Sequence, residues 1–468
     1  MSHAHFKTLL IIVVLYLLCA QSVLAQSGWQ YPTDIDLPLR LRYEDVYFTD
    51  TSTGYAVSLG DGGINMIAKP IYKTNDAGAH WRQIGPAING SGSLRSIEFL
   101  NDKVTGIVGS LNGTIYRTTD SGYTWTDISA AITDTVTTDN GSVGTKNICG
   151  LAHFGNNFYG VGWWGASRGR FYKSTDKGVS WTTTYLDTNL VSGLVDVVFL
   201  SADAGFITGG HNKNGGGMFS SSSDETVVLK TTDGGISWTK VFSDATIGGR
   251  IWKVQFIDRM NAVASIEPYY YPDSVNMIRS YDGGDTWSII HAGTVGGAAT
   301  TGLGNITQGV GFANQQIGWL GGYYTGVFQT TDGGATWQHL NFGTTFNRIF
   351  VIDSQHVFAG GAIVYKWTPI VASNVPAAPL RQPHILYPIS PNPTKGKVKI
   401  EFDILTETNV LLQVASVTQR KHSAITSGRF KPGHYVYYWD SANMPAGNYL
   451  VWLGTDEVPL TEQFVIER

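Results

Sequence analysis

The sequence contains little cysteine and little charge, and each scarcity excludes a class of protein. Its two cysteines are Cys19 and Cys149, among 468 residues. Because Cys19 lies in an apolar segment that we expect to be removed, Cys149 remains alone, and an intramolecular disulfide is excluded from the mature chain. Charged residues make up 15% of the chain, and the formal net charge is −4. This balance gives no reason to expect nucleic acid or an anionic membrane as a partner.

Long hydrophobic runs are scarce as well, and the run that is present lies at the N-terminus. Lys7 precedes an apolar segment from Leu9 to Cys19, and Val23-Leu24-Ala25 offers small residues before Gln26. This is the pattern of an export signal, and its apolar run is about half the length of a membrane span. We therefore expect residues 1–25 to be removed, leaving an exported chain without a transmembrane segment.

Glycine and aromatic residues, by contrast, are abundant. The chain has 56 glycines, 14 tryptophans, 23 tyrosines and 20 phenylalanines. Strands favour aromatic side chains, and tight turns need glycine. The composition therefore favours an all-β chain of short strands over a helical one.

One pattern returns six times: Thr or Ser, any residue, Asp, any residue, Gly, any two residues, Trp. The Asp can accept hydrogen bonds from the backbone of its own turn, and the Gly permits a positive φ. The Trp lies on the strand that leaves the turn, where it can be buried between adjacent sheets. We interpret these residues as structural. They are Asp76, Gly78, Trp81, Asp120, Gly122, Trp125, Asp176, Gly178, Trp181, Asp233, Gly235, Trp238, Asp282, Gly284, Trp287, Asp332, Gly334 and Trp337.

The repeat resembles the Asp-box (BNR) turns of a family of β-propellers that includes sialidases, xyloglucan-cleaving enzymes, sortilin-type receptors and photosystem II assembly-factor propellers. Successive box aspartates lie roughly 50 residues apart, which suits four short strands per blade. Further strands without a box follow at residues 348–367, and Ser27–Gln30 resembles the end of a box. We therefore predict a seven-bladed propeller over residues 26–368, closed by the N-terminal segment. A six-bladed ring is the alternative.

The C-terminal part reads as a second domain. A Pro- and Ala-rich linker at residues 369–386 precedes a strand-rich segment, residues 387–468, whose alternating apolar residues predict a small β-sandwich. This segment resembles the type A sorting domain of type IX secretion cargo. The matching residues are Pro391–Thr394, Gly433-His434, Trp439-Asp440, Ala446–Leu450 and a basic C-terminal residue.

One stretch departs from the sorting-domain pattern: Val414–Arg420 stands where the family usually has an Asp-x-x-Gly-Arg-like turn. The resemblance implies the secretion machinery as a partner, passage through an outer membrane, and removal of the domain. The chain is then secreted, extracellular or attached to the outer cell surface. An adhesive or carbohydrate-binding sandwich that stays attached is the alternative.

Candidate ligand-binding residues fall on the face opposite the Asp-box turns. Arg42, Arg95, Arg250 and Arg348 each precede an innermost strand, so they could ring the channel mouth and attract anions, or merely cover a sheet edge. His211 begins a Gly- and Ser-rich segment that could form a flap. Aromatic side chains suit sugar stacking or a protein partner, although half of them could pack between blades. They are Trp163, Trp164, Tyr269, Tyr270, Tyr271, Tyr323 and Tyr324.

Evidence for catalysis is thin in the sequence. Glu267 is the best candidate for an acid or base, but a glycosidase normally needs two carboxylates across the bond. Residues 38–44 lack the Arg-Ile-Pro-like segment of sialidases, and the chain carries no phosphate loop, nucleophile elbow or metal-ligand motif. We therefore expect no cofactor and no metal. The sequence favours a non-catalytic binding propeller for a glycan or protein ligand, with a secreted glycoside hydrolase of the sialidase or xyloglucanase type as the alternative.

Overall fold

The structure is a computed structural model of the chain. Within the part that it describes, the chain forms strands and one 3₁₀ turn, η1 (Ser129–Ala131), so the prediction of an all-β chain is confirmed. No helix in this part is long and apolar enough to cross a membrane. The expected export signal and most of the expected linker lie outside it. The described residues are 28–30, 42–58, 68–89, 93–111, 113–132, 147–162, 168–213, 224–268, 274–294, 307–322, 326–340, 342–343, 345–369, 384–416, 422–455 and 460–468.

Seven four-stranded antiparallel sheets account for the strands between residues 28 and 369. In six of them the strands follow one another in chain order. These six are β2 (Tyr43–Phe48), β3 (Gly54–Ser58), β4 (Ala68–Thr74) and β5 (Arg82–Asn89); β6 (Leu94–Phe99), β7 (Gly106–Ser110), β8 (Ile115–Thr118) and β9 (Thr126–Asp127); β10 (Gly150–Phe154), β11 (Asn157–Gly162), β12 (Arg170–Ser174) and β13 (Thr182–Tyr185); β14 (Gly193–Phe199), β15 (Gly205–Asn212), β16 (Asp224–Thr231) and β17 (Thr239–Asp244); β18 (Arg250–Phe256), β19 (Ala262–Glu267), β20 (Ser274–Ser280) and β21 (Ser288–Thr294); β22 (Thr307–Phe312), β23 (Gly318–Gly322), β24 (Val327–Thr330) and β25 (Gln338–Leu340).

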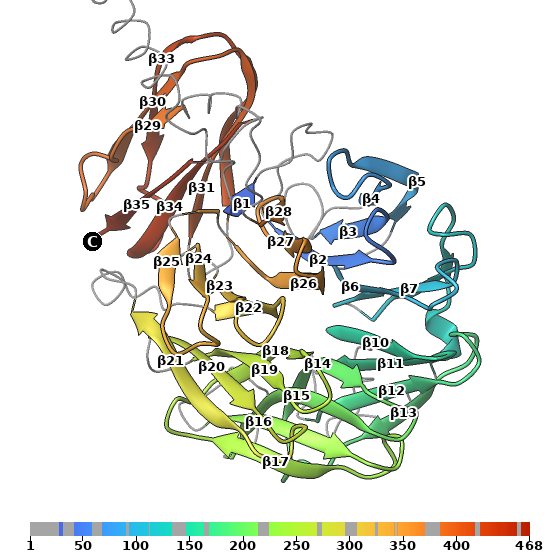
Figure 1. Cartoon of the computed structure of the whole chain (residues 1–468). Helices are drawn as coiled ribbons and strands as arrows, with labels where there is room; N and C mark the ends of the chain where they lie inside the picture. The colour runs from blue at the N-terminus through green and yellow to red at the C-terminus, as the bar shows by residue number, and fades with distance from the viewer. Residues whose placement is uncertain are drawn as a thin grey trace, which may run out of the picture.

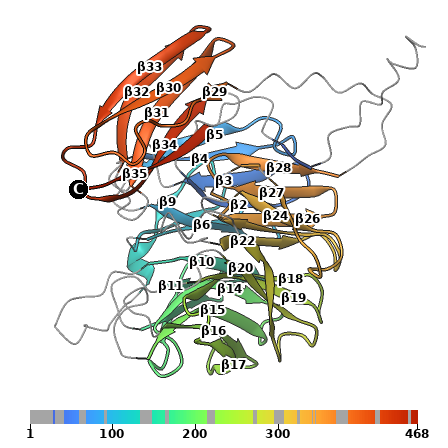
Figure 2. The ribbon, with the colours of Figure 1, turned by 90° about the vertical axis from the view of Figure 1, so that its left-hand side faces the viewer.

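The first strands of these sheets contact one another in a closed order. β2 contacts β6, β6 contacts β10, β10 contacts β14, β14 contacts β18, β18 contacts β22, β22 contacts β26, and β26 contacts β2 again. Sheets that follow one another in the chain are therefore neighbours in space, as the colour sequence in Figures 1 and 2 shows. Side chains from the first strands face a common axis.

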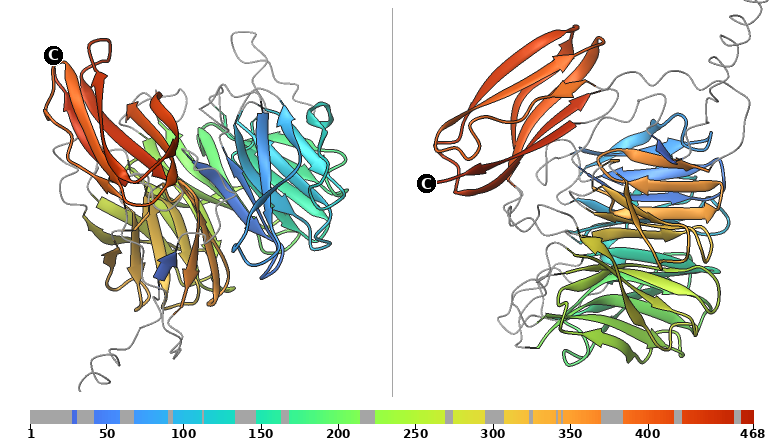
Figure 3. Two further views of the ribbon diagram at one scale, coloured as in Figure 1. Left: turned by 90° about the horizontal axis from the view of Figure 1, so that it is seen from above. Right: turned by 60° about the vertical axis from the view of Figure 1, so that its left-hand side comes forward.

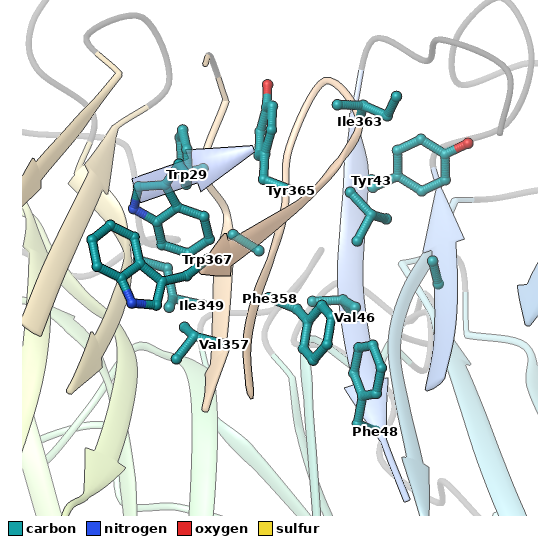
Figure 4. Close-up of a cluster of buried hydrophobic side chains, with 14 of the residues drawn as sticks. Trp29, Tyr43, Val46, Phe48, Ile349, Val357, Phe358, Ile363, Tyr365 and Trp367 are labelled. Carbon is teal, nitrogen blue, oxygen red and sulfur yellow. The ribbon is translucent and has the colours of Figure 1, made fainter. Parts of the chain in front are cut away.

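The last sheet joins the two ends of this ring. It consists of β26 (Arg348–Asp353), β27 (His356–Gly360), β28 (Val364–Thr368) and β1 (Gly28–Gln30) from the N-terminal part of the chain. β1 pairs with β28 so that Trp29 lies opposite Trp367. Trp29 is buried, and its ring makes edge contacts with Trp319 and Phe346 at 5.7 and 5.4 Å between centroids. The ring of Trp367 lies beside it at 6.0 Å (Figure 4). This aromatic cluster fixes the closing strand.

The Asp-box turns are held by the hydrogen bonds that the sequence suggested. In the turn at Asp233, the Thr231 hydroxyl and the Ser237 N–H donate to Asp233 Oδ1 at 2.7 and 2.9 Å, and the Ser237 hydroxyl donates to Oδ2 at 2.5 Å. These bonds, those from Ser237 first, lower the pKa of Asp233 to about 2. Gly235 has a φ of +89°, and a Cβ there would lie 2.3 Å from Phe171 of the preceding sheet. The box aspartates are thus structural anions.

A basic residue directly before five of the six boxes ties each sheet to the next, a feature that the sequence analysis missed. Arg117 Nε donates to the carbonyl of Lys177 at 2.8 Å, and Lys173 Nζ donates to the carbonyl of Gly234 at 2.8 Å. In both cases the acceptor lies in the Asp-box turn of the following sheet. Lys73 and Arg279 donate in the same way to the carbonyls of Ser121 and Gly333 in the next box, and Lys230 forms an ion pair with the carboxylate of Asp285 there. The recurrence of Lys or Arg at this position could have revealed the contact.

The C-terminal strands form two further sheets that share one core. One sheet contains β29 (Ile385–Leu386), β30 (Lys397–Ile404) and β33 (Gly433–Asp440). The other contains β32 (His422–Phe430), β31 (Thr408–Ser416), β34 (Gly447–Thr455) and β35 (Leu460–Ile466). Phe402 of the first sheet and Leu412 and Phe464 of the second belong to the same buried cluster. Figure 3 shows these strands in orange and red as two layers.

Candidate functional site

Irregular pairing in the innermost strands directs polar side chains toward the axis of the ring. In five sheets, the register between the first and second strands shifts near the start of the first strand. A β-bulge adds a residue to one strand and re-aims its side chain. The residues within these shifts are Glu44, Arg95, Val195, Trp252, Lys253 and Gln308. Four of them contribute to one cluster, described next.

Trp252 is the centre of this cluster. The guanidinium carbons of Arg95, Arg250 and Arg42 lie 4.8, 5.3 and 5.9 Å from the centroid of its ring. Cys149 and Val195 pack against the same indole, which is itself buried. Cation–π contacts of this kind are stronger when the groups are desolvated. Residues from five different sheets therefore meet around one tryptophan.

Two carboxylates and one amide connect the arginines. Glu44 forms ion pairs with Arg42, at 2.9 Å between Nε and Oε1, and with Arg95. Glu267 forms an ion pair with Arg250 and accepts a hydrogen bond from Gln308 Nε2 at 3.1 Å. Gln308 Oε1 in turn accepts from Arg42 Nη2 at 2.8 Å. We call these residues the Trp252 cluster: Arg42, Glu44, Arg95, Arg250, Trp252, Glu267 and Gln308. Within this set, three guanidiniums lie beside two carboxylates.

Arg348 occupies a different position from the other three arginines. Its Nε lies 3.7 Å from Asp45 Oδ1, and its Nη1 lies 3.7 Å from Asp196 Oδ2. Lys253 Nζ also pairs with Asp196, at 3.0 Å. Burial opposes the charged form of Arg348, but Asp45 and Asp196 outweigh it and raise the pKa of the guanidinium. Arg348 therefore bridges two sheets that are not adjacent in the ring.

Asp45 and Asp196 also link neighbouring sheets. Asp45 Oδ2 accepts the backbone N–H of Ile97 at 3.1 Å, and Asp196 Oδ2 accepts that of Val254 at 3.0 Å. Burial raises the pKa of Asp45, although Arg348 and Lys253 act in the opposite direction. Asp45 and Asp196 thus connect neighbouring sheets from buried positions, and the nearby cations Arg348 and Lys253 offset the cost of burying their negative charge.

The structure places the sequence-predicted residues in three groups. Arg42, Arg95, Arg250 and Glu267 come together in the Trp252 cluster, and Arg348 does not join them. Arg42, Arg95 and Arg250 are buried and ion-paired, whereas the side chain of Arg348 is 23% exposed. His211 belongs to another cluster, where Glu225 pairs with it and with Lys213 and Lys240.

The predicted aromatic residues lie outside the described part of the chain. They are Trp163, Trp164, Tyr269, Tyr270, Tyr271, Tyr323 and Tyr324. Trp252, Glu44 and Gln308 were not predicted as site residues. They lie in β-bulges, and no residue pattern in the sequence predicts where a bulge occurs. Within the described ranges, His, Cys, Asp and Glu side chains form no group of three or more that could hold a metal ion.

Comparison with known proteins shows the fold alone. No protein-family model matches the chain, and no curated protein matches it. The GH74 xyloglucanase from Xanthomonas campestris superposes with a TM-score of 0.52 at 12% identity, over 93% of this chain and 75% of that one. The WD40 repeats of RRP9 superpose with a TM-score of 0.50 at 12% identity, over 73% and 99%. YCF48 from Cyanidioschyzon merolae reaches 0.49 at 16% identity, over 73% and 99%. The prediction of a β-propeller is thereby confirmed.

Proposed function

We propose that the chain is an exported, seven-bladed propeller that binds a ligand carrying acidic groups, either a glycan or a polypeptide, without transforming it. The observation that carries this proposal is the convergence of three guanidiniums, those of Arg42, Arg95 and Arg250, on Trp252. These cations lie among buried groups, where screening by salt is weak. Their convergence therefore favours anions that approach this end of the axis.

The aromatic loops begin at the same end as the cluster. Arg250 lies opposite Glu267 in the pairing of β18 with β19, and Tyr269 follows Glu267 by two residues. β11 and β23 are likewise second strands, and they end at Gly162 and Gly322, directly before the other two aromatic loops. All three loops therefore follow strand ends at the end of the ring that carries the three arginines. A combination of aromatic residues and guanidiniums suits an acidic sugar or an acidic peptide segment.

The geometry favours binding over glycoside hydrolysis. A retaining or inverting glycosidase needs one carboxyl group that donates a proton and a second carboxylate across the scissile bond. Glu267 is bound by Arg250 and Gln308, and Glu44 is bound by Arg42 and Arg95. Both carboxyl groups are therefore occupied by cations or donors rather than presented to a substrate.

Replacing Tyr269, Tyr270 and Tyr271 together by Ala is expected to weaken binding by about tenfold or more, since a few aromatic anchors usually dominate an interface. The probes are polygalacturonate and poly-glutamate, with a neutral glucan as control, and calorimetry measures the affinity. The melting temperature should not change.

Unchanged affinity of the triple Tyr variant for a probe that the native chain binds would refute this site. Hydrolysis of polygalacturonate or of the glucan by the native chain, lost on Glu267→Gln, would favour the hydrolase instead.

We further propose that residues 387–468 form a sorting β-sandwich and that residues 1–25 are an export signal. The motif residues coincide with strand ends: Pro391–Thr394 precede β30, Gly433 and Asp440 bound β33, and Gly447 begins β34. The two sheets have a common core, as a domain that folds before its removal needs.

The intact mass of the chain recovered from the surface of its native cell is expected to lack residues 1–25 and 387–468. Both cleavages follow from export through a system that removes its sorting domain. A mass that retains residues 387–468 would contradict this proposal and favour a permanently attached adhesive sandwich.

A further inference from the structure

Two kinds of turn lie side by side at the end of the ring that carries the Asp boxes. One kind is the hairpin between the first and second strands of a sheet, and the other is the Asp-box turn between the third and fourth. The Ser121 N–H donates to the carbonyl of Val104 at 3.0 Å, and the Gly283 N–H donates to that of Met260 at 2.9 Å. The same bond recurs from Gly234 to Asp203 at 2.8 Å. These bonds join the turns of each sheet into one continuous surface.

Large apolar side chains are exposed on this surface in four consecutive sheets, β6–β9 to β18–β21. Each sheet contributes one side chain from its hairpin and one from its Asp-box turn. We call these eight the apolar arc: Val104, Tyr123, Phe154, Val179, Leu200, Ile236, Met260 and Tyr281. They are 37% to 82% exposed, and they are all of the exposed large hydrophobic side chains in the described residues between 28 and 369.

The fold does not require these apolar residues, because other sheets of the ring do without them. Ala79 and Ala335 occupy the position after the box glycine that Val179 and Ile236 occupy in the arc. At the hairpin position of Met260, another sheet has Gln316, whose carbonyl accepts the equivalent bond from Gly333 at 2.8 Å. A structural need of the repeat would recur in every sheet. The confinement of the arc to four neighbouring sheets therefore indicates a contact surface.

The charges around the arc select the kind of partner. The box aspartates Asp176, Asp233 and Asp282 lie in the same turns, and their pKa values are lowered to about 2, so they are anionic at neutral pH. Basic residues of these sheets, such as Arg117 and Lys173, are directed into the neighbouring turn, where they bind carbonyls. Lys103, Lys177 and Arg259 are also exposed on these turns. The aspartates of the same turns outnumber them, so the apolar side chains lie on a surface with more carboxylates than cations. These aspartates are Asp102, Asp120, Asp176, Asp203, Asp233, Asp258, Asp282 and Asp285. Such a pattern complements a polypeptide with apolar residues bordered by Lys or Arg.

We propose that the apolar arc docks a basic, apolar segment of a protein partner. Three side chains of the arc are aromatic, namely Tyr123, Phe154 and Tyr281, but the other five are aliphatic and lack the flat face on which sugars stack. The carboxylates repel an anionic lipid surface. The arc lies at the opposite end of the ring from the Trp252 cluster, so this proposal does not depend on the ligand proposed above. The chain then joins two partners through opposite ends.

The test uses a phage-displayed library of random peptides selected on the full chain. Val179→Ser/Ile236→Ser/Met260→Ser serves as counter-target. A matched control, Ala79→Ser/Ala335→Ser/Gln316→Ser, changes the equivalent positions of the polar sheets. The selected peptides are expected to combine apolar residues with Lys or Arg, and synthetic copies should bind the arc variant about tenfold or more weakly than the native chain. The control should bind as the native chain does, and both variants should keep its melting temperature, because all replaced side chains are at the surface.

Three results would overturn the proposal. The first is equal peptide binding by the arc variant and the control. The second is selection of acidic or uncharged sequences. The third is self-association of the native chain in sedimentation velocity that the arc variant abolishes, because a second copy then occupies the arc.

Discussion

Replacing Trp29 by Ala is expected to lower the free energy of unfolding by about 3–5 kcal/mol, the usual cost of truncating a buried tryptophan. Trp29 lies on the short strand β1 beside Trp367 (Figure 4), and its ring also contacts Trp319 and Phe346. The replacement leaves a cavity and weakens the strand that joins the two ends of the ring. Urea unfolding, followed by tryptophan fluorescence and circular dichroism, measures the loss.

Tyr281→Ala is the matched control for Trp29→Ala. Tyr281 is also an aromatic residue of the ring, but it is exposed, and its truncation should change the stability by about 0.5 kcal/mol or less. A loss below about 1 kcal/mol for Trp29→Ala would mean that β1 contributes little to ring closure, since even a modest buried truncation costs more.

Replacing Arg348 by Met is expected to cost about 3–5 kcal/mol at neutral pH, because it leaves buried carboxylates without a cation that neutralises them. Asp45 loses its ion pair, and Asp196 keeps only Lys253. The methionine fills much of the same space, so the loss reports charge rather than volume. Denaturant unfolding at several pH values measures it.

The pH dependence of this loss has a definite sign. Burial already raises the pKa of Asp45 in the folded chain, and removal of Arg348 raises it further. A carboxyl group with a raised folded pKa binds a proton more readily in the native state than in the unfolded state. The variant should therefore gain stability relative to the native chain as the pH falls through that folded pKa, toward the unfolded value of about 3.9.

Arg259→Met provides the control for Arg348→Met, because Arg259 is exposed in a hairpin and should change stability by about 0.5 kcal/mol or less. Adding Asp45→Asn to Arg348→Met should recover part of the loss, since an amide oxygen can still accept the N–H of Ile97. A loss that is independent of pH and unaffected by Asp45→Asn would show that Arg348 acts by packing alone.

The repeats of the sequence predicted the turns well because they depend on local chemistry. A Ser or Thr, an Asp and a Gly at fixed spacing can bond only to one another and to their own backbone, as the turn at Asp233 shows. The closing strand was also visible, since Gly28-Trp29-Gln30 resembles the end of a box and β1 pairs with β28. Such signals are contained within a few consecutive residues.

The Trp252 cluster could not be predicted in the same way. A bulge shifts one residue out of the alternation of side chains along a strand, and five sheets contain such a shift near the start of their first strand. The position of each arginine before a strand left two interpretations open, a ring around the channel mouth or a cover over a sheet edge. Arg348 instead lies between Asp45 and Asp196, because its neighbours are set by the register of other sheets. Contacts across the axis depend on all sheets at once.

The basic residue before five of the six boxes changes what counts as the repeating unit of this chain. Lys173 and the turn at Asp176 belong to one sheet, yet Lys173 binds the next sheet and that turn receives Arg117 from the sheet before. One repeat taken alone has its donor and its acceptor facing opposite neighbours, so it cannot complete either bond. The smallest self-consistent module is therefore the junction between two sheets. A repeat can be duplicated or lost without breaking these junctions only if the segment that is copied or removed runs from the basic residue before one box to the basic residue before the next.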